Sequence, residues 1–372
     1  MASLSQACQG GATGYPAVPG DGLAGLSQAR NIILLVIDGL GYDYLKGQCQ
    51  GSLLSSYCQR RLTSVCPSTT ATAIPTFLTG LPPQQHGFTG WFTYFSEIGA
   101  VLAVLPFHTR VGFSPINESL LSPMKLSGVD SFFSRIPISS NVIIPDWIAT
   151  SSFNRAFSSG AKIVPFSGLK GLRRALQRVP RRSQKRSFSY AYWPEFDSLA
   201  HRFGVGSTQV QAHFQQLDRL FGDLLSDLRG SDSVLLVTAD HGFIDSSPDT
   251  RIHLESHPAL QQLLMVPLCG EPRLAFCYVH PGREKAFKAY VRENFSRQVA
   301  LFPSLQLLEE GWFGRGSPHP GLQHRIGHYA LVMQDNWTID GRLPGEGPLQ
   351  QIGVHGGVSS EEMYVPLVYA EA

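Results

Sequence analysis

The chain has 372 residues, of which 43% are hydrophobic and 16% charged, a composition typical of a folded globular protein. Its formal net charge is only +2 at pH 7, so no overall field favours nucleic acid or a charged membrane as its main partner. No run of about 18 apolar residues is available to span a bilayer. We therefore expect a soluble protein whose preference for any anion comes from a local site.

Residues 1–30 are rich in glycine, alanine and proline and lack the basic start and apolar stretch of a secretory signal. We predict a partly disordered N-terminal segment there. The six cysteines form no paired CxxC pattern, which argues against a zinc knuckle and, without a signal, against a disulfide framework. These features together predict a cytoplasmic location.

Short apolar runs at residues 31–37, 187–193, 233–238 and 364–369 are each bounded by turn-forming residues. Residues 208–228 between two of them carry apolar side chains at helical spacing. This alternation predicts an α/β fold with a largely parallel sheet covered by helices. We assign residues 31–245 and 351–372 to this core.

The remaining segments give weaker patterns. Residues 110–160 are rich in Ser, Pro and Phe and are expected to form loops and short elements beside the main sheet. Residues 246–350 contain their own predicted strand at 274–280 and helix at 283–295, which indicates a small inserted subdomain. The basic run at 170–186 is interpreted as a solvated helix face followed by a loop, with an RNA contact as the alternative.

Acidic and histidine side chains follow three of the predicted strands. Asp38 ends the first, Asp197 and His201 follow the second at helical spacing, and Asp240 with His241 ends the third. Parallel strands present their carboxyl ends at one edge of a sheet, where α/β proteins bind ligands. Each of these residues could instead serve as a helix cap or a hydrogen-bonded surface pair.

A further histidine, His355, is flanked by glycines that allow close approach of the backbone to a site. Three carboxylates and three imidazoles without a thiolate suit Zn²⁺, with Mn²⁺ as an alternative. They are enough for two divalent ions that keep open positions. The other histidines have no partner at ligand spacing and are expected to pack or face solvent.

A cluster of hydroxyls, Ser68, Thr69, Thr70 and Thr72, precedes a helix-like stretch. One of these could lie at a helix N-terminus, where the helix dipole and a metal ion would favour an alkoxide nucleophile. An N-cap without catalytic chemistry is the alternative.

Five motifs carry a resemblance to a known family: IDGLG (37–41), PSTTATAIPTFLTGLPPQQHG (67–87), DSLAHRFG (197–204), TADHG (238–242) and VHGG (354–357). These motifs occur in the family's order along nearly the whole chain. The chain therefore resembles the type I phosphodiesterases and nucleotide pyrophosphatases of the alkaline phosphatase superfamily. The resemblance implies an alkaline-phosphatase-like three-layer α/β/α sandwich with a two-metal site, usually zinc.

The resemblance also implies roles for individual residues. Asp38, Asp240, His241 and Thr70 would surround one ion, and Asp197, His201 and His355 the other. Thr70, with Thr69 as the fallback, would attack phosphorus to give a covalent phospho-threonine intermediate.

The sequence departs from the family where nucleotide pyrophosphatases carry an asparagine that holds a phosphate oxygen. Trp91 stands there by count, and with Phe92 and Tyr94 it could form an apolar wall or simply pack in the core. No Cys-x-Pro-x-Arg motif is present, which disfavours a sulfatase. Related monoesterases bind the extra negative charge of their substrate with an arginine or a third metal ion, and no such group can be assigned in this sequence.

The expected function is hydrolysis of small-molecule phosphodiesters or pyrophosphates. A phosphomonoesterase or phosphonate hydrolase on the same core, and a non-catalytic metal-containing binding protein, are the alternatives. The oligomeric state is open.

Overall fold

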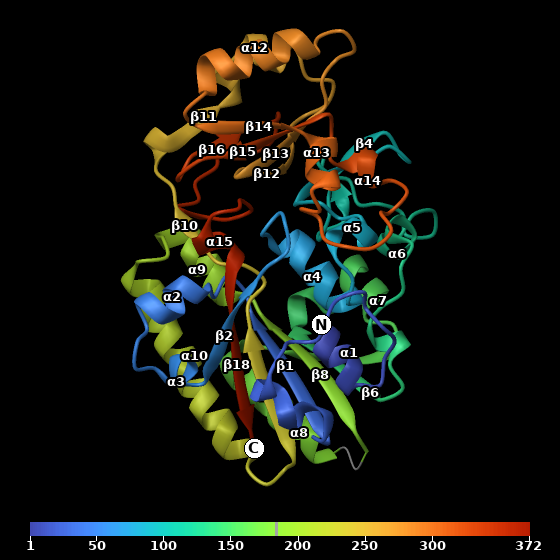
Figure 1. Ribbon diagram of the computed structural model, residues 1–372, viewed down its shortest axis with the longest axis vertical. Coiled ribbons are helices and arrows are strands. Elements are labelled where there is room, and N and C mark those ends of the chain that lie inside the picture. Colours follow the sequence, from blue (N-terminus) through green and yellow to red (C-terminus); the bar gives the residue numbers. More distant parts are fainter. Residues whose placement is uncertain (183–184) are drawn as a thin grey trace.

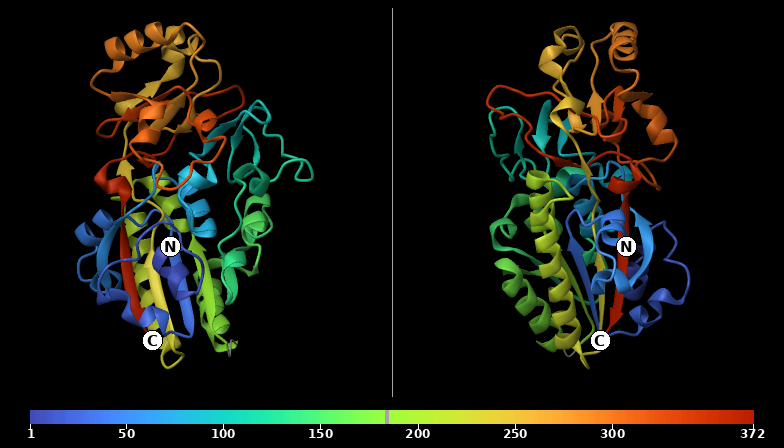
Figure 2. Two further views of the ribbon diagram at one scale, coloured as in Figure 1. Left: turned by 45° about the vertical axis from the view of Figure 1, so that its right-hand side comes forward. Right: turned by 90° about the vertical axis from the view of Figure 1, so that its left-hand side faces the viewer.

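The computed structural model describes residues 1–182 and 185–372. It consists of two bodies stacked along the longest axis of the molecule, a larger one that contains both termini and a smaller one above it (Figures 1 and 2). Each body is built on a seven-stranded sheet in the described part of the chain.

The sheet of the larger body has the order β2-β18-β9-β1-β8-β6-β7. Its strands β9, β1, β8, β6 and β7 are parallel neighbours, whereas β18 runs antiparallel between β2 and β9. The bounds are β1 Asn31–Ile37, β2 Cys58–Thr63, β6 Ser139–Pro145, β7 Ala161–Phe166, β8 Ser187–Trp193, β9 Ser233–Thr238 and β18 Tyr364–Glu371. The prediction of an α/β fold with a mostly parallel sheet is confirmed.

Helices cover both faces of this sheet because the buried strands are apolar on both sides. In β1, Ile32, Leu34 and Val36 face one hydrophobic cluster, and Ile33, Leu35 and Ile37 face the other. The helices on the first face are α1 Ala2–Ala7, α4 Thr70–Thr79, α6 Pro123–Ser127 and α7 Ser152–Phe157. Those on the second are α2 Tyr42–Gly47, α3 Leu53–Ser56, α8 Gly168–Arg182, α9 Glu195–Phe203 and α10 Thr208–Leu228.

The smaller body contains the antiparallel sheet β14-β15-β13-β12-β3-β4-β5. Its strands are β3 Phe92–Phe95, β4 Ala100–Ala103, β5 His108–Thr109, β12 Cys269–Glu271, β13 Leu274–Cys277, β14 Val299–Pro303 and β15 Tyr329–Met333. Its helices include α11 Pro258–Gln261, α12 Glu284–Phe295, α13 Ser304–Glu309 and α14 Leu322–Arg325. The short pairs β10 Ile244–Asp245 with β17 Gly353–Val354 and β11 Arg251–His253 with β16 Thr338–Asp340 complete the connections.

The subdomain is therefore not made of residues 246–350 alone. Residues 92–109 supply three of its strands, joined through the pairing of Gly270 with Phe92. Helix α5, Pro83–His86, and α15, Ser360–Met363, lie on the chain segments that enter and leave it. Such long-range antiparallel pairing leaves no signal in local sequence patterns.

The structure corrects one expectation for residues 110–160. This stretch contains β6, which lies inside the main sheet between β8 and β7. Its apolar run is short and bounded by Ser140 and Pro145, so the strand signal was weak.

Two other expectations concern the N-terminal segment and the basic run at residues 170–186. In the N-terminal segment, α1 buries Leu4 and Ala7 against the core. The basic run forms α8, with Leu172 and Leu176 buried, but the loop expected after it falls at residues 183–184, outside the described residues. Among the described helices, none is long and apolar enough to cross a membrane.

Candidate two-metal active site

The site lies at the carboxyl edge of the main sheet. Strand β1 pairs with β8 and β9 so that Ile37 is opposite Trp193 and Val36 opposite Thr238. The three strands thus end at nearly the same level, and the residues that follow them converge. Asp38 comes after β1, helix α9 after β8, and Asp240 with His241 after β9.

Asp38, Asp240 and His241 form the first group of potential ligands. His241 Nε2 lies 3.3 Å from Asp38 Oδ1 and 3.6 Å from Asp240 Oδ2. Tyr192 donates a hydrogen bond to the other oxygen of Asp38, and the amide of Gly39 donates to Asp240 Oδ1 at 3.0 Å. These outer bonds fix both carboxylates while leaving one oxygen of each directed at the group.

Asp197, His201 and His355 form the second group. Asp197 and His201 are one turn apart on α9, with Oδ1 and Nε2 separated by 3.3 Å. His355 follows β17, and its Nε2 lies 3.7 Å from Asp197 Oδ1 and 3.2 Å from His201 Nε2. Asp197 Oδ1 also lies 4.0 Å from His241 Nε2, so the two groups are adjacent.

Each histidine presents Nε2 to the site because its Nδ1 faces a backbone carbonyl. Nδ1 of His201 lies 2.8 Å from the carbonyl oxygen of Gly353, that of His241 3.0 Å from Gly242, and that of His355 3.2 Å from Ser68. A carbonyl can only accept, so these contacts place the proton on Nδ1. The lone pair on Nε2 is then free to bind a cation, as in metal sites with oriented imidazoles.

The electrostatics fit divalent cations. Burial and the neighbouring Asp197 charge raise the pKa of Asp38 well above its ordinary value, and burial with the Asp38 charge does the same for Asp240. Burial lowers the pKa of His201, but the Asp197 charge outweighs it and raises the net value to about 9. Asp197 Oδ1 and Asp240 Oδ2 are buried without a hydrogen-bond partner. The unmet negative charge and the unpaired oxygens are what a pair of cations would satisfy.

Thr70 is the first residue of α4, and Thr69 is its N-cap. The Thr70 hydroxyl lies 3.1 Å from His241 Nε2 and 3.5 Å from Asp38 Oδ1. It therefore borders the first group of ligands and stands at the positive end of a helix dipole.

Gly242 allows the turn after His241, but not through a left-handed conformation. A Cβ at this position would lie 2.0 Å from the carbonyl oxygen of Glu361 and 3.0 Å from Cα of Gly41. The glycine is thus required by the close approach of the C-terminal segment rather than by its φ angle.

A cavity of about 630 Å³ opens from the ligand groups toward the smaller body. The residues that line it include Thr70, Asp197, His201 and His355 from the site, and also Trp91 and Phe92. Tyr94 packs instead against Tyr278 in the sheet, with ring centroids 5.0 Å apart.

Glu271 lines this cavity, although sequence reasoning did not single it out. It ends β12, is 8% exposed and accepts a hydrogen bond of 2.6 Å from the backbone amide of Trp91. Burial raises the pKa of Glu271 to about 7, and hydrogen bonds from the Thr69 side chain and the Trp91 amide partly offset that increase. The sequence offered only an acidic residue three positions before an apolar strand as a signal.

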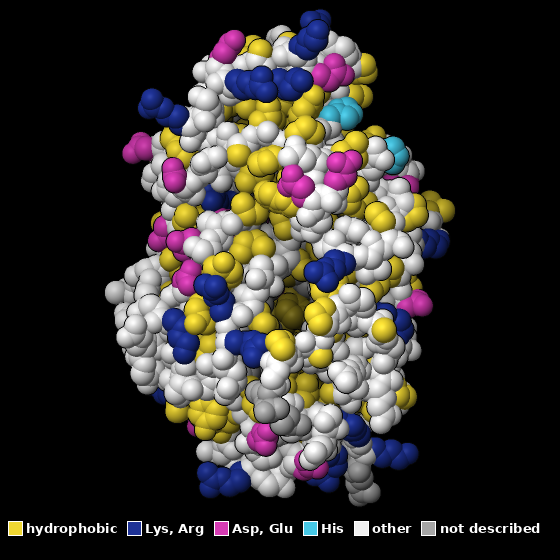
Figure 3. Space-filling model, viewed as in Figure 1, with side chains coloured by type: hydrophobic (Ala, Val, Ile, Leu, Met, Phe, Trp, Pro, Cys, Tyr) yellow, Lys and Arg dark blue, Asp and Glu magenta, His cyan; other side chains and the backbone are white. Residues whose placement is uncertain are grey.

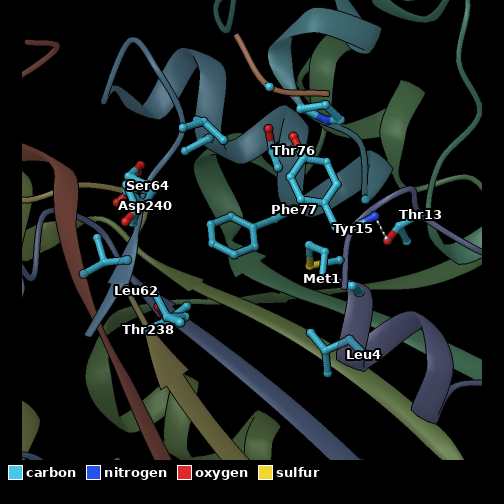
Figure 4. A pocket seen from close by; sticks show the side chains of 18 of the residues that line it. Met1, Leu4, Thr13, Tyr15, Leu62, Ser64, Thr76, Phe77, Thr238 and Asp240 are labelled. Atoms are coloured by element: carbon cyan, nitrogen blue, oxygen red, sulfur yellow. Dashed lines mark hydrogen bonds between the residues drawn. The ribbon is translucent and has the colours of Figure 1, made fainter. Parts of the chain in front are cut away.

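A second, largely apolar cavity of about 570 Å³ lies on the opposite side of α4. Figure 4 shows Phe77 and Thr76 from α4, Leu62 from β2 and Leu4 from α1 around it. In the space-filling view, the same face of the molecule is hollowed near its middle, with hydrophobic side chains inside (Figure 3). Asp240 of the first ligand group also lines this cavity, whereas none of the histidines described above does. The cavity therefore borders the ligand groups only at Asp240.

Comparison with known proteins places this geometry in a family. The sequence model of type I phosphodiesterase/nucleotide pyrophosphatase matches residues 32–357. The chain belongs to this family. The match includes all six potential metal ligands and Thr70, and the predicted resemblance is confirmed. Comparison with curated proteins gave no match.

Solved structures of this superfamily share the fold. An inactive murine ectonucleotide pyrophosphatase/phosphodiesterase 5 in complex with AMP is 15% identical, with a TM-score of 0.68 over 90% of this chain and 87% of that one. Phosphonoacetate hydrolase from Sinorhizobium meliloti in complex with phosphonoformate is 16% identical, with a TM-score of 0.65 over 92% and 90%. The family supports a phosphoric ester hydrolase, and it implies divalent metal ions, typically zinc.

Proposed function

We propose that this family member hydrolyses phosphodiesters with Thr70 as the nucleophile and two divalent ions, Zn²⁺ by preference, as cofactors. The observation that carries the proposal is the position of the Thr70 hydroxyl. It lies within 3.5 Å of both Asp38 and His241 at the N-terminus of a ten-residue helix, beside two adjacent ligand groups.

The residues present fit two ions, with Asp38, Asp240, His241 and Thr70 around one and Asp197, His201 and His355 around the other. Bound cations would lower the cost of a Thr70 alkoxide and neutralise charge that develops on the phosphoryl oxygens. The chain itself holds each imidazole through Nδ1 and orients Thr70 at the helix N-terminus. Attack by Thr70 on phosphorus releases one alcohol and leaves a phosphoryl group on Thr70 that still carries the second ester. Water then cleaves the bond between Thr70 and phosphorus, which releases a phosphomonoester and restores the hydroxyl.

A diester preference is supported by the absence of a cation to meet the second charge of a monoester. Among the described residues that line the cavity, Arg110 is the only lysine or arginine. Its guanidinium is already bound to both oxygens of Glu346, at 2.8 and 2.9 Å. It is therefore not free to bind a dianionic phosphate.

Hydrolysis of phosphonates is a second candidate, supported by the fold similarity to phosphonoacetate hydrolase. We would compare bis-p-nitrophenyl phosphate, p-nitrophenyl phosphate and phosphonoacetate as substrates of metal-stripped protein with Zn²⁺ or Mn²⁺ restored. A preference for the first supports the proposal. Preference for either of the others keeps the site and changes the function. No metal-dependent hydrolysis of any of them would favour the non-catalytic alternative.

A further inference from the structure

The charged side chains of the cavity of about 630 Å³ beside the ligand groups, called the outer cavity below, indicate which substrates it can accept. Beyond the metal-ligand groups, the charged residues that line it are Arg110, Glu271, Asp340 and Glu346. Three of these four are acidic, which is the opposite of what a polyphosphate or second phosphoryl group requires.

Arg110 does not change this balance. It is 6% exposed, and besides its two bonds to Glu346 it donates to the carbonyl oxygens of Leu268 and Gly341, both at 2.7 Å. Its guanidinium also stacks on the ring of Phe92, 4.0 Å from the centroid. Each nitrogen of the guanidinium thus donates within the protein, and the charges of Arg110 and Glu346 neutralise each other.

Within residues 1–182 and 185–372, neither Glu271 nor Asp340 forms a salt bridge. The charges of His253 and Arg251 on the neighbouring strand β11 act on Asp340 without direct pairing. Glu271 is held against the site by the Trp91 amide on one oxygen. Gly356, next to His355, makes room for it, because a Cβ there would lie 2.6 Å from the Glu271 side chain. The carboxylate is thus fixed beside the ligand groups in a position where it can meet a substrate.

Aromatic side chains complete the same wall. Trp91 and Phe113 line the cavity and remain 38% and 49% exposed. Unlike Phe92, neither has a cation of the protein over its ring in the described structure. Fixed carboxylates beside exposed aromatic rings are the groups that bind an organic ammonium ion.

We infer that the preferred substrates are phosphodiesters in which one of the two alcohols carries a positively charged organic group, either a protonated amine or a quaternary ammonium. The inference rests on the proposed function and narrows it. The outer cavity holds the cationic group between Glu271, Asp340 and the aromatic wall, while the phosphoryl group faces Thr70. A nucleoside polyphosphate would place its charges against the same two carboxylates.

Four p-nitrophenyl esters test the preference for a cationic group. They share p-nitrophenol as the leaving group and differ in the other substituent on phosphorus. They are p-nitrophenyl phosphorylcholine, bis-p-nitrophenyl phosphate, thymidine 5′-(p-nitrophenyl phosphate) and p-nitrophenyl phosphate. We expect kcat/KM of the zinc-loaded enzyme to be highest for the choline ester, by about tenfold over the two diesters that lack a cationic group. Equal values, or preference for the thymidine ester, would overturn the inference while leaving the proposed function intact. Absence of hydrolysis of all four would instead remove the proposed function.

Variants of the two acidic residues test whether they cause the preference for the choline ester. Glu271→Gln keeps the shape and can still accept the Trp91 amide, so we expect the choline ester to lose about tenfold in kcat/KM and bis-p-nitrophenyl phosphate to change less than twofold. Asp340→Asn, on a different strand, is expected to act in the same direction. Glu309→Gln, an exposed acid of the smaller body, is the matched control. Equal losses for both substrates in both variants would contradict charge recognition.

Discussion

Thr70 is the residue on which the proposed chemistry depends, and its neighbour offers an internal control. Thr69 is buried one residue earlier as the N-cap of α4, and its hydroxyl interacts with the carboxyl group of Glu271 rather than with the ligand groups. Thr70→Ala should reduce kcat for diester hydrolysis by at least about 10³-fold, since removal of a nucleophile eliminates the covalent route.

The same variant should bind two equivalents of zinc and unfold at nearly the same temperature as the wild type, because the carboxylates and imidazoles remain. Thr69→Ala should retain most of the activity. If Thr69→Ala were the inactive variant instead, the nucleophile would have to be reassigned to the fallback position.

His86 gives a pH dependence of stability that does not involve the site. It is fully buried, its Nε2 lies 3.1 Å from the Thr76 hydroxyl, and burial lowers its pKa to about 3. The unfolded chain binds this proton below about pH 6.5 and the native state does not, so stability must fall as the pH drops below that value.

One such group contributes a slope of about 1.4 kcal/mol per pH unit, hence roughly 2 kcal/mol between pH 6.5 and 5. Urea unfolding at pH 7.5, 6.5 and 5.0 should show the loss, and His86→Asn should reduce it by about that amount. An unchanged pH slope in the variant would show that His86 titrates normally.

At the scale of elements, the Arg273–Glu362 ion pair connects the smaller body to both ligand loops. Arg273 is 1% exposed and donates to both oxygens of Glu362, at 3.1 and 2.8 Å. Glu362 also accepts from the amide of Gly357, two residues after His355, and its carbonyl accepts from Gly242, next to His241. The pair therefore positions two histidines that belong to different ligand groups.

Arg273→Lys should keep the positive charge but lose the bidentate pairing with the carboxylate of Glu362. We expect zinc affinity to fall by about 10- to 100-fold, as for other residues that orient metal ligands. Arg325→Lys is the control, because Arg325 is equally buried and is paired with Glu97. Its other hydrogen-bond partners in the described residues, the carbonyl oxygens of Gly87 and Leu126, lie outside the ligand loops. Competition with a chelator measures both affinities, and similar losses in the two variants would refute a specific role for Arg273.

The same elements show what could be predicted from the sequence. Strands β1, β8 and β9 and helix α10 have the expected bounds, because continuous apolar runs and helical spacing are local signals. The convergence of Asp38, Asp197 and Asp240 followed from parallel topology alone. β18 runs antiparallel and β3 to β5 join the second sheet, and neither feature is encoded in a local pattern. Glu271 reaches the site through that second sheet, so it could not be found without the structure.

At the scale of the whole molecule, metal binding should link stability to the site. Six potential ligands come from four separated chain segments, and His355 lies on the segment that returns from the smaller body to β18. Such a set is assembled only in the folded state, so cations bind the native protein far better than the unfolded chain.

Zinc at 100 times its dissociation constant should therefore stabilise the protein by about 2.7 kcal/mol per site. Removal of zinc with a chelator should lower Tm, and Asp197→Asn should abolish most of the response. A Tm that does not depend on zinc would show that the six residues do not form a metal site.

The most direct test of the central claim is a search for phosphothreonine in rapidly quenched enzyme. Zinc-loaded protein is mixed with bis-p-nitrophenyl phosphate, quenched in acid within the first turnover, digested and analysed by mass spectrometry. The account predicts a nitrophenyl phosphoryl adduct on the peptide that contains Thr70 and none in Thr70→Ala. Hydrolysis at the same rate without any adduct, undiminished in the variant, would contradict it and assign the attack to water.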